Sequence, residues 1–324
     1  MGSFLTEAKY FWQYLVQLLL PGKPQFSTKQ IPDLTGQVML VTGGNAGIGK
    51  ETVKALLEHN AKVYLAARSR ERAEAAIQDL QKQTGKTAIF LELDMSSLAS
   101  VRKAAEEFMS KETALHVLFN NAGVMWCSIE ILSVDGYDLQ FATNVIGHFY
   151  FTKLLIPALL VGRDSSPDRH ARIVTTSSST AYLYTINWES FKDGPARRKM
   201  STRQLYSQSK FANVVVARET AKRYADQGII SLSLDPGSID TEIQRTVPGI
   251  QRWLARVLVF YPASFGALTQ LWAGTMPEAI NHNGKFLIPW ARVGRCREEA
   301  YDDRIGERLW DWLEEQVKGF QPEA

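Results

Sequence analysis

The sequence predicts a single-domain α/β fold, in which a doubly wound and mostly parallel β-sheet carries helices on both faces. Short apolar runs alternate with amphipathic helical stretches between residues 37 and 160, and this alternation is typical of βαβ units. The first apolar run leads directly into a glycine-rich segment, and no linker or composition break divides the chain. With 324 residues, of which 45% are hydrophobic, the chain can bury a sizeable core.

The expected elements follow one another in a regular order. We expect strands at 38–41, 62–67, 88–93, 116–119, 172–175 and 230–234. Between the first four strands we expect helices at 51–59, 71–83 and 100–109. Two polar stretches, 162–170 and 187–204, are interpreted as surface loops.

Composition and charge exclude several classes of protein. The net charge is +3, the basic residues are scattered, and there is no nucleic-acid-binding motif. The two cysteines, Cys127 and Cys296, are far apart and form neither a disulfide framework nor a zinc motif. The five histidines lack metal-ligand spacing. We therefore expect a protein of a reducing compartment that binds neither nucleic acid nor a metal.

Residues 1–22 are expected to form a separate amphipathic helix, which Pro21-Gly22 ends. Apolar residues recur at helical spacing on one face: Phe4, Leu5, Ala8, Phe11, Trp12, Leu15, Val16 and Leu19. The run is shorter than the ~20 apolar residues that span a bilayer. It also lacks the basic start and the cleavage site of a secretory signal.

Two interpretations of this helix stay open. It docks on the protein's own surface, or residues 4–20 lie in a membrane interface. We accordingly expect a cytoplasmic protein, or one peripherally associated with the cytosolic side of a membrane, and not a secreted one.

The glycine-rich segment connects the first strand to the first helix. Thr42 to Gly49 read TGGNAGIG. Glycines allow a tight turn and a close approach of backbone N–H groups to a pyrophosphate, and the following helix directs its positive end at that phosphate. This placement after the first strand indicates a Rossmann-type dinucleotide-binding fold.

A phosphate-binding P-loop is the competing interpretation of the same residues. Gly44 to Lys50 match GxxxxGK, but a P-loop next needs Ser or Thr to hold magnesium. The next residue is Glu51, whose charge opposes the phosphates, so a P-loop NTPase is disfavoured.

The end of the second strand indicates which dinucleotide binds. A fold that prefers NAD places Asp or Glu there for the ribose hydroxyls, whereas this chain has Arg68, followed by Arg70. A cation at this place suits a 2′-phosphate, and Lys50 can add charge. The sequence thus predicts NADP(H), the alternative being that these cations only begin a solvated helix.

Tyr206 and Lys210 are a candidate acid–base pair. Residues four apart lie on one face of a helix, so both side chains can reach the same ligand. A free tyrosine titrates near ~10, and a neighbouring ammonium favours the phenolate. We therefore expect Lys210 to lower the pKa of Tyr206.

Taken together, the motifs resemble those of the short-chain dehydrogenase/reductase family. TGxxxGIG is followed in the family's order by an NNAG motif, a helix asparagine, a serine after the fifth strand, YxxxK and a PG turn. The resemblance covers about residues 37–245, and it is strongest to the retinol dehydrogenase and WW-domain oxidoreductase branch, as seen in segments 44–52, 144–149 and 209–213.

The resemblance implies a set of site residues. The catalytic residues would be Asn144, Ser178, Tyr206 and Lys210, with Ser177 and Ser179 as alternatives to Ser178. The cofactor-binding residues would be Gly43, Asn45, Gly47, Ile48, Gly49, Arg68, Asp94, Asn121, Ala122, Gly123, Tyr206, Lys210, Pro236, Gly237 and Thr241. Residues 23–324 would form the dinucleotide-binding and catalytic domain, with a C-terminal substrate lid around 241–262.

The resemblance also implies a reaction and a class of substrate. We expect a hydride to pass between NADP(H) and the carbonyl or alcohol group of a lipophilic small molecule, in the direction of reduction. Apolar and aromatic residues that would line its pocket are Met125, Trp126, Tyr182, Tyr184 and segment 247–261. These residues could instead form lid packing or a subunit contact, so a homo-oligomer stays open. The alternative function is a catalytically silent NADP-binding scaffold.

Overall fold

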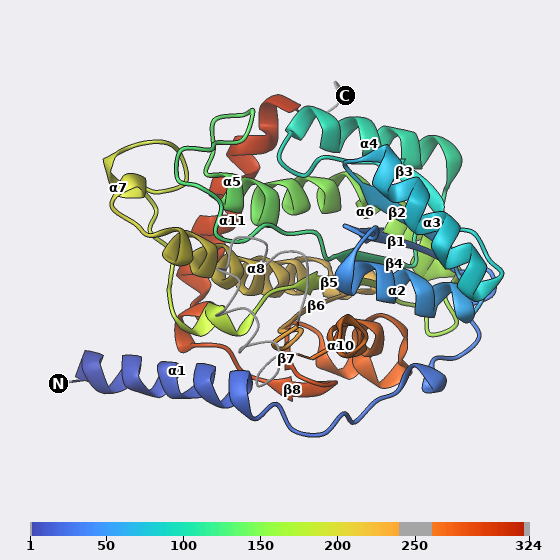
Figure 1. Cartoon of the computed structure of the whole chain (residues 1–324). Helices are drawn as coiled ribbons and strands as arrows, with labels where there is room; N and C mark the ends of the chain where they lie inside the picture. Colours follow the sequence, from blue (N-terminus) through green and yellow to red (C-terminus); the bar gives the residue numbers. More distant parts are fainter. Residues whose placement is uncertain (1, 240–260, 321–324) are drawn as a thin grey trace.

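An eight-stranded sheet runs through the computed structural model of the chain, which describes residues 2–239 and 261–320 (Figure 1). Its strand order is β3-β2-β1-β4-β5-β6-β7-β8. The strands pair in parallel except for β8, which runs antiparallel to β7. The strands are β1 (Val38–Thr42), β2 (Lys62–Ala67), β3 (Ile89–Glu92), β4 (Val117–Asn120), β5 (Ala171–Thr176), β6 (Ile229–Leu234), β7 (Phe286–Ile288) and β8 (Arg292–Gly294).

Helices cover both faces of this sheet (Figure 1). On one face lie α2 (Gly47–Glu58), α3 (Arg70–Thr84) and α10 (Ala263–Thr275). On the other lie α4 (Leu98–Lys111), α6 (Gly147–Ser165), α8 (Thr202–Tyr224) and α11 (Asp303–Val317). The other helices of the described residues are α1 (Gly2–Leu19), α5 (Leu139–Phe141) and α7 (Pro195–Arg198). A π-helical turn, η2 (Ala142–Ile146), and several 3-10 turns complete this part of the chain: η1 (Thr28–Gln30), η3 (Ser179–Tyr182), η4 (Ala225–Gln227), η6 (Pro277–His282), η7 (Glu298–Tyr301) and η8 (Lys318–Phe320).

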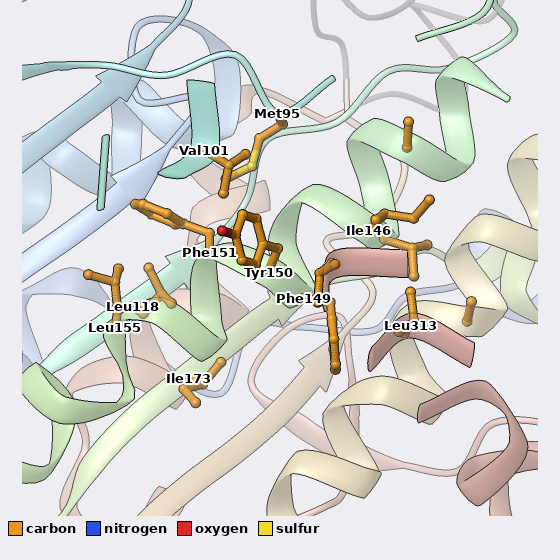
Figure 2. Packing of buried hydrophobic residues seen from close by; sticks show 14 of the residues in the cluster. Met95, Val101, Leu118, Ile146, Phe149, Tyr150, Phe151, Leu155, Ile173 and Leu313 are labelled. Atoms are coloured by element: carbon orange, nitrogen blue, oxygen red, sulfur yellow. The ribbon is translucent and has the colours of Figure 1, made fainter. Parts of the chain in front are cut away.

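The four central strands, β1, β4, β5 and β6, are buried along their whole length. Every residue of these strands is buried, as expected for a parallel sheet covered on both faces. Figure 2 shows the core between the sheet and α6, where Phe149, Phe151 and Leu155 meet residues of β4, β5 and α11. The doubly wound, mostly parallel fold predicted from the sequence is confirmed.

The first predicted surface loop, 162–170, is wrong over its first residues. Helix α6 continues to Ser165, and a Cβ atom added at Gly162 would lie 2.0 Å from the Leu115 carbonyl oxygen. Glycine therefore serves a close approach of two backbones here, and it does not mark the start of a loop.

The second predicted loop, 187–204, is also more structured than expected. It contains α7 and the first residues of α8. The Arg197 guanidinium bonds the Asp138 carboxylate at 3.0 Å, and both side chains are buried. The Phe191 ring stacks on Phe141 at 4.1 Å. These contacts anchor the insertion to the core, although its composition is polar.

Within residues 2–239 and 261–320, one helical run is long and apolar enough to cross a membrane by length and composition. It covers Leu139–Ser165, and 67% of its most apolar window is buried inside the protein. The core packing in Figure 2 accounts for this hydrophobicity, because the run is the central helix of one layer.

Helix α1 docks on the protein through the face that carries Glu7, Tyr10 and Gln17. Tyr10 is buried, and the Arg297 guanidinium lies 4.7 Å from its ring centre. Arg297 also bonds Glu7 at 2.7 Å. Further along the helix, Gln17 Nε2 donates to the Tyr182 hydroxyl at 2.7 Å.

The apolar face of α1 points away from the protein instead. Phe11 is 53% exposed and Trp12 67% exposed, and Val16 and Leu19 are exposed as well. The docked helix thus presents its apolar side outward, which is the reverse of a helix that packs on a hydrophobic core. Most of the lid expected around 241–262 lies outside the described residues.

Candidate active site

The candidate site lies at the carboxyl ends of four neighbouring strands, where the strand order reverses beside β1. The TGxxxGIG loop follows β1, the NNAG motif follows β4, the serine triplet follows β5, and the PG turn follows β6. Ligands of open α/β sheets bind at such a switch point. The fold therefore brings the motifs together although they are spread over almost 200 residues of sequence.

The glycine loop has the geometry that a phosphate-binding turn requires. Gly43 and Gly47 have φ values of +67° and +52°, a region that favours glycine. A Cβ atom at Gly49 would lie 2.3 Å from the Gly43 carbonyl oxygen. The N-cap residue of α2, Ala46, has no side-chain cap hydrogen bond. The first-turn N–H groups of α2 are thus not capped by that residue and are suited to an anion.

Two other predicted cofactor-binding residues of this loop, Asn45 and Ile48, are in contact with the rest of the protein. Asn45 is partly buried. Ile48 packs on α10, since a Cβ atom at Gly266 would lie 2.7 Å from its Cγ1. This contact holds the start of α2 against the rest of its layer.

Thr42 joins the glycine loop to the NNAG motif. Its Oγ1 accepts hydrogen bonds from the backbone N–H groups of Asn121 and Ala122, both at 2.9 Å. The Asn121 side chain donates to the Thr42 carbonyl oxygen at 2.8 Å. Three hydrogen bonds therefore fix the two dinucleotide motifs relative to each other.

The three basic side chains near the loop differ in their partners. Arg68 follows β2, its side chain is 69% exposed, and its nearest carboxylate is Asp94 at 3.8 Å. Arg70 pairs with two glutamates and lies over the Phe90 ring. Lys50 pairs with Asp79 at 2.5 Å. Of these three side chains, Arg68 thus has the weakest interactions with other protein groups. A residue that is to bind the 2′-phosphate of NADP(H) needs this availability.

Lys210 points from α8 toward the end of β5. Its Nζ donates to the Thr176 carbonyl oxygen at 2.9 Å and lies 5.8 Å from the centre of the Tyr206 ring. Burial lowers the pKa of Lys210 to about 8, because the charged form is poorly solvated inside the protein.

The pKa of Tyr206 differs from the sequence expectation. Burial raises the pKa of Tyr206, a hydrogen bond with the Ser178 side chain lowers it in part, and the Asp235 charge raises it further. We expected Lys210 to lower this pKa, but in this structure desolvation of the phenolate outweighs the favourable effects. Tyr206 is therefore held in its neutral, proton-carrying form.

The structure separates the roles of the three consecutive serines. Ser178 hydrogen-bonds Tyr206. Ser177 Oγ instead donates to the Lys210 carbonyl oxygen at 2.6 Å, and the backbone of Ser179 hydrogen-bonds the Asp235 carboxylate. Only the Ser178 hydroxyl, among these three, meets the tyrosine.

Asn144 lies on the π-helical turn η2 beside the NNAG motif. Its side-chain oxygen accepts from Val124 N at 2.9 Å, and its Nδ2 donates to Ser209 Oγ at 2.9 Å. A Cβ atom at Gly123 would lie 3.2 Å from Asn144 Oδ1 and 3.4 Å from Lys210 Nζ. Gly123 therefore leaves room for these two side chains to approach one another, and π-turns are frequent at functional sites.

Several of the predicted pocket residues have other contacts in this structure. Tyr182 is buried and bonded to Gln17 and to the Arg295 carbonyl oxygen, whereas Tyr184 is partly exposed. Trp126 has a φ of +55° and lies under the Arg203 guanidinium. Thr241 and segment 247–260 lie outside the described residues.

Sequence reasoning missed two buried titratable groups at the site. His148 contacts Thr42 and Asn144, and Asp235 contacts the PG turn and the serine triplet. Their signals were present but weak: His148 is four residues from Asn144, and Asp235 directly precedes Pro236.

Comparisons with known proteins agree with this geometry. A family model described as short chain dehydrogenase matches residues 37–192. A short-chain dehydrogenase/reductase of Armillaria gallica is 56% identical over 306 residues, which are 94% of this chain and 98% of that protein. Retinol dehydrogenase 11 of Mus musculus is 33% identical over 285 residues, covering 86% of this chain and 85% of the mouse protein.

A solved structure of the same kind is a short chain dehydrogenase from Burkholderia cenocepacia in complex with NADP. It is 26% identical, with a TM-score of 0.62, and the match covers 80% of this chain and 98% of that one. Fold and site together define an oxidoreductase on a dinucleotide-binding sheet. The chain belongs to the short-chain dehydrogenase/reductase family, and the retinol dehydrogenase-like resemblance is confirmed.

Proposed function

We propose that the chain is an NADP(H)-dependent reductase that converts a carbonyl group of a lipophilic small molecule to an alcohol. The observation that carries this proposal is the cluster of Ser178, Tyr206 and Lys210 beside Gly123 and Asn144. A proton donor, a hydroxyl that can bind the substrate oxygen and a buried ammonium meet at the switch point of the sheet.

The residues present fit an NADP(H) cofactor. The Gly43–Gly49 turn, with no room for a Cβ at Gly49, would hold the pyrophosphate. Arg68 would hold the 2′-phosphate. The other cofactor-binding residues would be Asp94, Asn121, Ala122, Gly123, Tyr206, Lys210, Pro236, Gly237 and Thr241. Bound there, the nicotinamide supplies the hydride.

The protein's own groups would then handle the proton and the geometry. Tyr206 donates its phenolic proton to the carbonyl oxygen, and Ser178 hydrogen-bonds that oxygen and orients it. Lys210 would bind the nicotinamide ribose, and Asn144 would position a water that connects Lys210 to solvent. These four side chains are our proposed catalytic set.

The direction of the reaction is inferred from the protonation of Tyr206. An ordinary tyrosine already carries its proton at neutral pH, and burial, which raises the pKa of Tyr206, favours that form further. Reduction needs that proton, whereas oxidation needs the phenolate as a base. The free chain is thus prepared for reduction.

The substrate class rests on two kinds of support. Met125 and Trp126 come two and three residues after the end of the NNAG motif and offer apolar surface near the site. A relative over most of the chain is named a retinol dehydrogenase, so retinoid-like aldehydes and ketones are the first candidates. We include steroid and polyketide carbonyls as further lipophilic candidates.

A panel of lipophilic carbonyl compounds tests the proposal. We expect NADPH consumption with at least one of them, and a loss of about 10²–10⁴-fold in Tyr206→Phe, which removes only the acidic hydroxyl. Ser178→Ala should lower kcat, and Ser177→Ala and Ser179→Ala are matched controls that should lower it less. Cofactor binding without turnover on any compound would instead support the silent scaffold.

A further inference from the structure

The first turn of α8 lies between two loops of the site. On one side, Gln204 Nε2 donates to the hydroxyl of Tyr184 in the loop after β5. On the other side, the Arg203 guanidinium carbon lies 4.9 Å from the ring centre of Trp126 in the loop after β4. Arg203 and Tyr206 are three residues apart and share one face of the helix. This turn therefore stands at the edge of the site, just before the proposed proton donor.

Trp126 is held in a backbone conformation that is rare for a large side chain. Its φ of +55° lies in the left-handed region, which is strained for a bulky residue, and such residues are frequent where proteins bind ligands. Its backbone N–H donates to Gln140 Oε1 at 2.7 Å. Gln140 is 1% exposed, and its Nε2 donates to the Thr202 carbonyl oxygen at 3.0 Å. This buried amide ties the Trp126 backbone to the first residue of α8 and fixes the indole beside Arg203.

Arg203 differs from its neighbours Arg197 and Arg198 in lacking an acidic partner. Those two arginines pair with aspartates at 3.0 Å and 2.7 Å. Arg203 is exposed, and in the part of the chain that the structure describes it forms no ion pair with a carboxylate. A guanidinium stacked on an aromatic ring is oriented while its N–H groups stay available, and its planar fork matches a carboxylate.

We propose that Arg203 and Trp126 form a subsite for a carboxylate carried by the substrate, so that the chain prefers lipophilic carbonyl compounds that are also acids. This inference rests on the proposed function and narrows its substrate class. The guanidinium binds the carboxylate through two hydrogen bonds, and the indole contacts the apolar chain beside it. Because about 5 Å of helix axis separates Arg203 from Tyr206, the carboxylate and the reacting carbonyl are several bonds apart.

Matched pairs of an oxo-acid and its methyl ester test the subsite. The two compounds share one medium-length chain with a ketone near the far end, and only the acid is charged at neutral pH. In the wild type, kcat/KM should be about tenfold higher for the acid, mainly through KM. An acid whose carboxylate adjoins the carbonyl should gain nothing over its ester, because it cannot reach both Arg203 and Tyr206.

Variants at two arginines separate the subsite from a general effect of charge. Arg203→Met keeps an unbranched stem beside Trp126 but removes the cation. Its kcat/KM for the acid should fall about tenfold, to the level of the ester, whose own value should stay within about twofold. Arg203→Lys keeps the charge without the planar fork and should fall between them. Arg198→Met, which removes a paired and exposed cation, should change neither substrate.

Equal ratios of acid to ester in the wild type and in Arg203→Met would overturn the proposal. An equal fall for both compounds in Arg203→Met would overturn it as well, because that result means that Arg203 only supports the structure around Trp126.

A binding measurement distinguishes this inference from the proposed function. Decanoate has the carboxylate and the chain but no ketone, so its titration into the protein with NADP⁺ reports the subsite without turnover. It should bind the wild type about tenfold more tightly than Arg203→Met, and methyl decanoate should bind both equally. If this holds in a protein that reduces no carbonyl compound, only the proposed function is refuted. If carbonyl compounds are reduced but decanoate binds both proteins equally, only the subsite is refuted.

Discussion

The imidazole of His148 lies 3.0 Å, measured from Nε2, from the hydroxyl oxygen of Thr42. Its other nitrogen, Nδ1, lies 3.2 Å from the Asn144 carbonyl oxygen. Burial lowers the pKa of His148 to about 4; the Asn144 hydrogen bond opposes this shift in part, and the Lys210 charge contributes to it. The ring is therefore neutral at physiological pH, donates to Asn144 through Nδ1 and accepts through Nε2. It connects the π-helical turn to the dinucleotide motifs.

This relationship predicts coupled effects of substitution at the two positions. His148→Leu and Thr42→Val should each weaken NADPH binding, because Thr42 also holds the N–H groups of Asn121 and Ala122. Each loss should destabilise the protein by about 1–3 kcal/mol. The double variant should lose less stability and less NADPH affinity than the two single variants lose together. Urea unfolding and NADPH titration measure the two quantities. Strict additivity would mean that the two residues act separately.

The same histidine predicts acid sensitivity. A group with a depressed folded-state pKa contributes stability that is present above its unfolded value, 6.5, and is lost as the pH falls toward 4. The loss attributable to His148 is roughly 3 kcal/mol. Between pH 6.5 and 4 the unfolding free energy of His148→Leu should fall less steeply than that of the wild type. Parallel curves would refute this assignment.

Cofactor preference should depend on Arg68. We expect NADPH to bind more tightly than NADH, and Arg68→Asp to narrow or reverse the preference by roughly 10–100-fold, since one charge-assisted contact is lost. Arg70→Asp is the matched control, because Arg70 is already paired with Glu74 and Glu92. Equal wild-type affinity for both dinucleotides in a fluorescence titration would contradict the argument.

The parts of the site that could be predicted from sequence are those with local causes. Gly43 to Gly49 follow a buried strand and open a helix, and Tyr206 and Lys210 are one helical turn apart, so their placement needs no knowledge of distant residues. The same reasoning located all six expected strands, because each is a short apolar run between turn residues.

The parts that could not be predicted depend on contacts between distant segments. The raised pKa of Tyr206 follows from its burial, and the partners of Asp235 lie on loops far away in the sequence. Gly162 looked like a loop residue, but its real partner is the backbone of Leu115. Sequence pattern reports which residues are apolar, and it does not report which backbones touch.

Replacing Lys210 should stabilise the protein while removing its activity. Burial lowers the pKa of Lys210 from 10.5 to about 8, so the charged amine disfavours folding by roughly 3 kcal/mol below pH 8. Since the unfolded state binds more protons between these values, that penalty disappears as the pH rises toward 10.5. The Thr176 carbonyl oxygen keeps a donor in Lys210→Met, because Asn213 Nδ2 lies 3.3 Å away.

Urea unfolding at pH 7 and pH 10 checks this prediction. Lys210→Met should be more stable than the wild type at pH 7, and the difference should shrink at pH 10. NADPH affinity and turnover should both fall, since a proposed ribose contact is lost. A variant that is less stable than the wild type at pH 7 would show that the ammonium is well accommodated.

The outward apolar face of α1 predicts membrane contact. Its inner face is occupied by Tyr10, Gln17 and the Glu7–Arg297 pair, whereas Phe11 and Trp12 are exposed. Aromatic and aliphatic side chains on one exposed helical face are typical of helices that lie in a membrane interface. We propose that this face enters the interface while the inner face stays docked.

Variants of the two faces of α1 separate membrane binding from folding. Phe11→Glu with Trp12→Glu should abolish co-sedimentation with vesicles of phosphatidylcholine and phosphatidylserine, and should change the unfolding free energy by less than about 0.5 kcal/mol because both side chains are exposed. Gln17→Ala should do the opposite: it removes the bond to Tyr182, lowers stability by about 1 kcal/mol and leaves vesicle binding intact. Deleting residues 1–22 should release the protein from vesicles and also lower its Tm, since Arg297 and Tyr182 lose their partners. The membrane assignment is wrong if the wild type does not co-sediment with vesicles and the Phe11 and Trp12 substitutions convert a dimer to a monomer on a sizing column. The outward face would then be a contact between subunits.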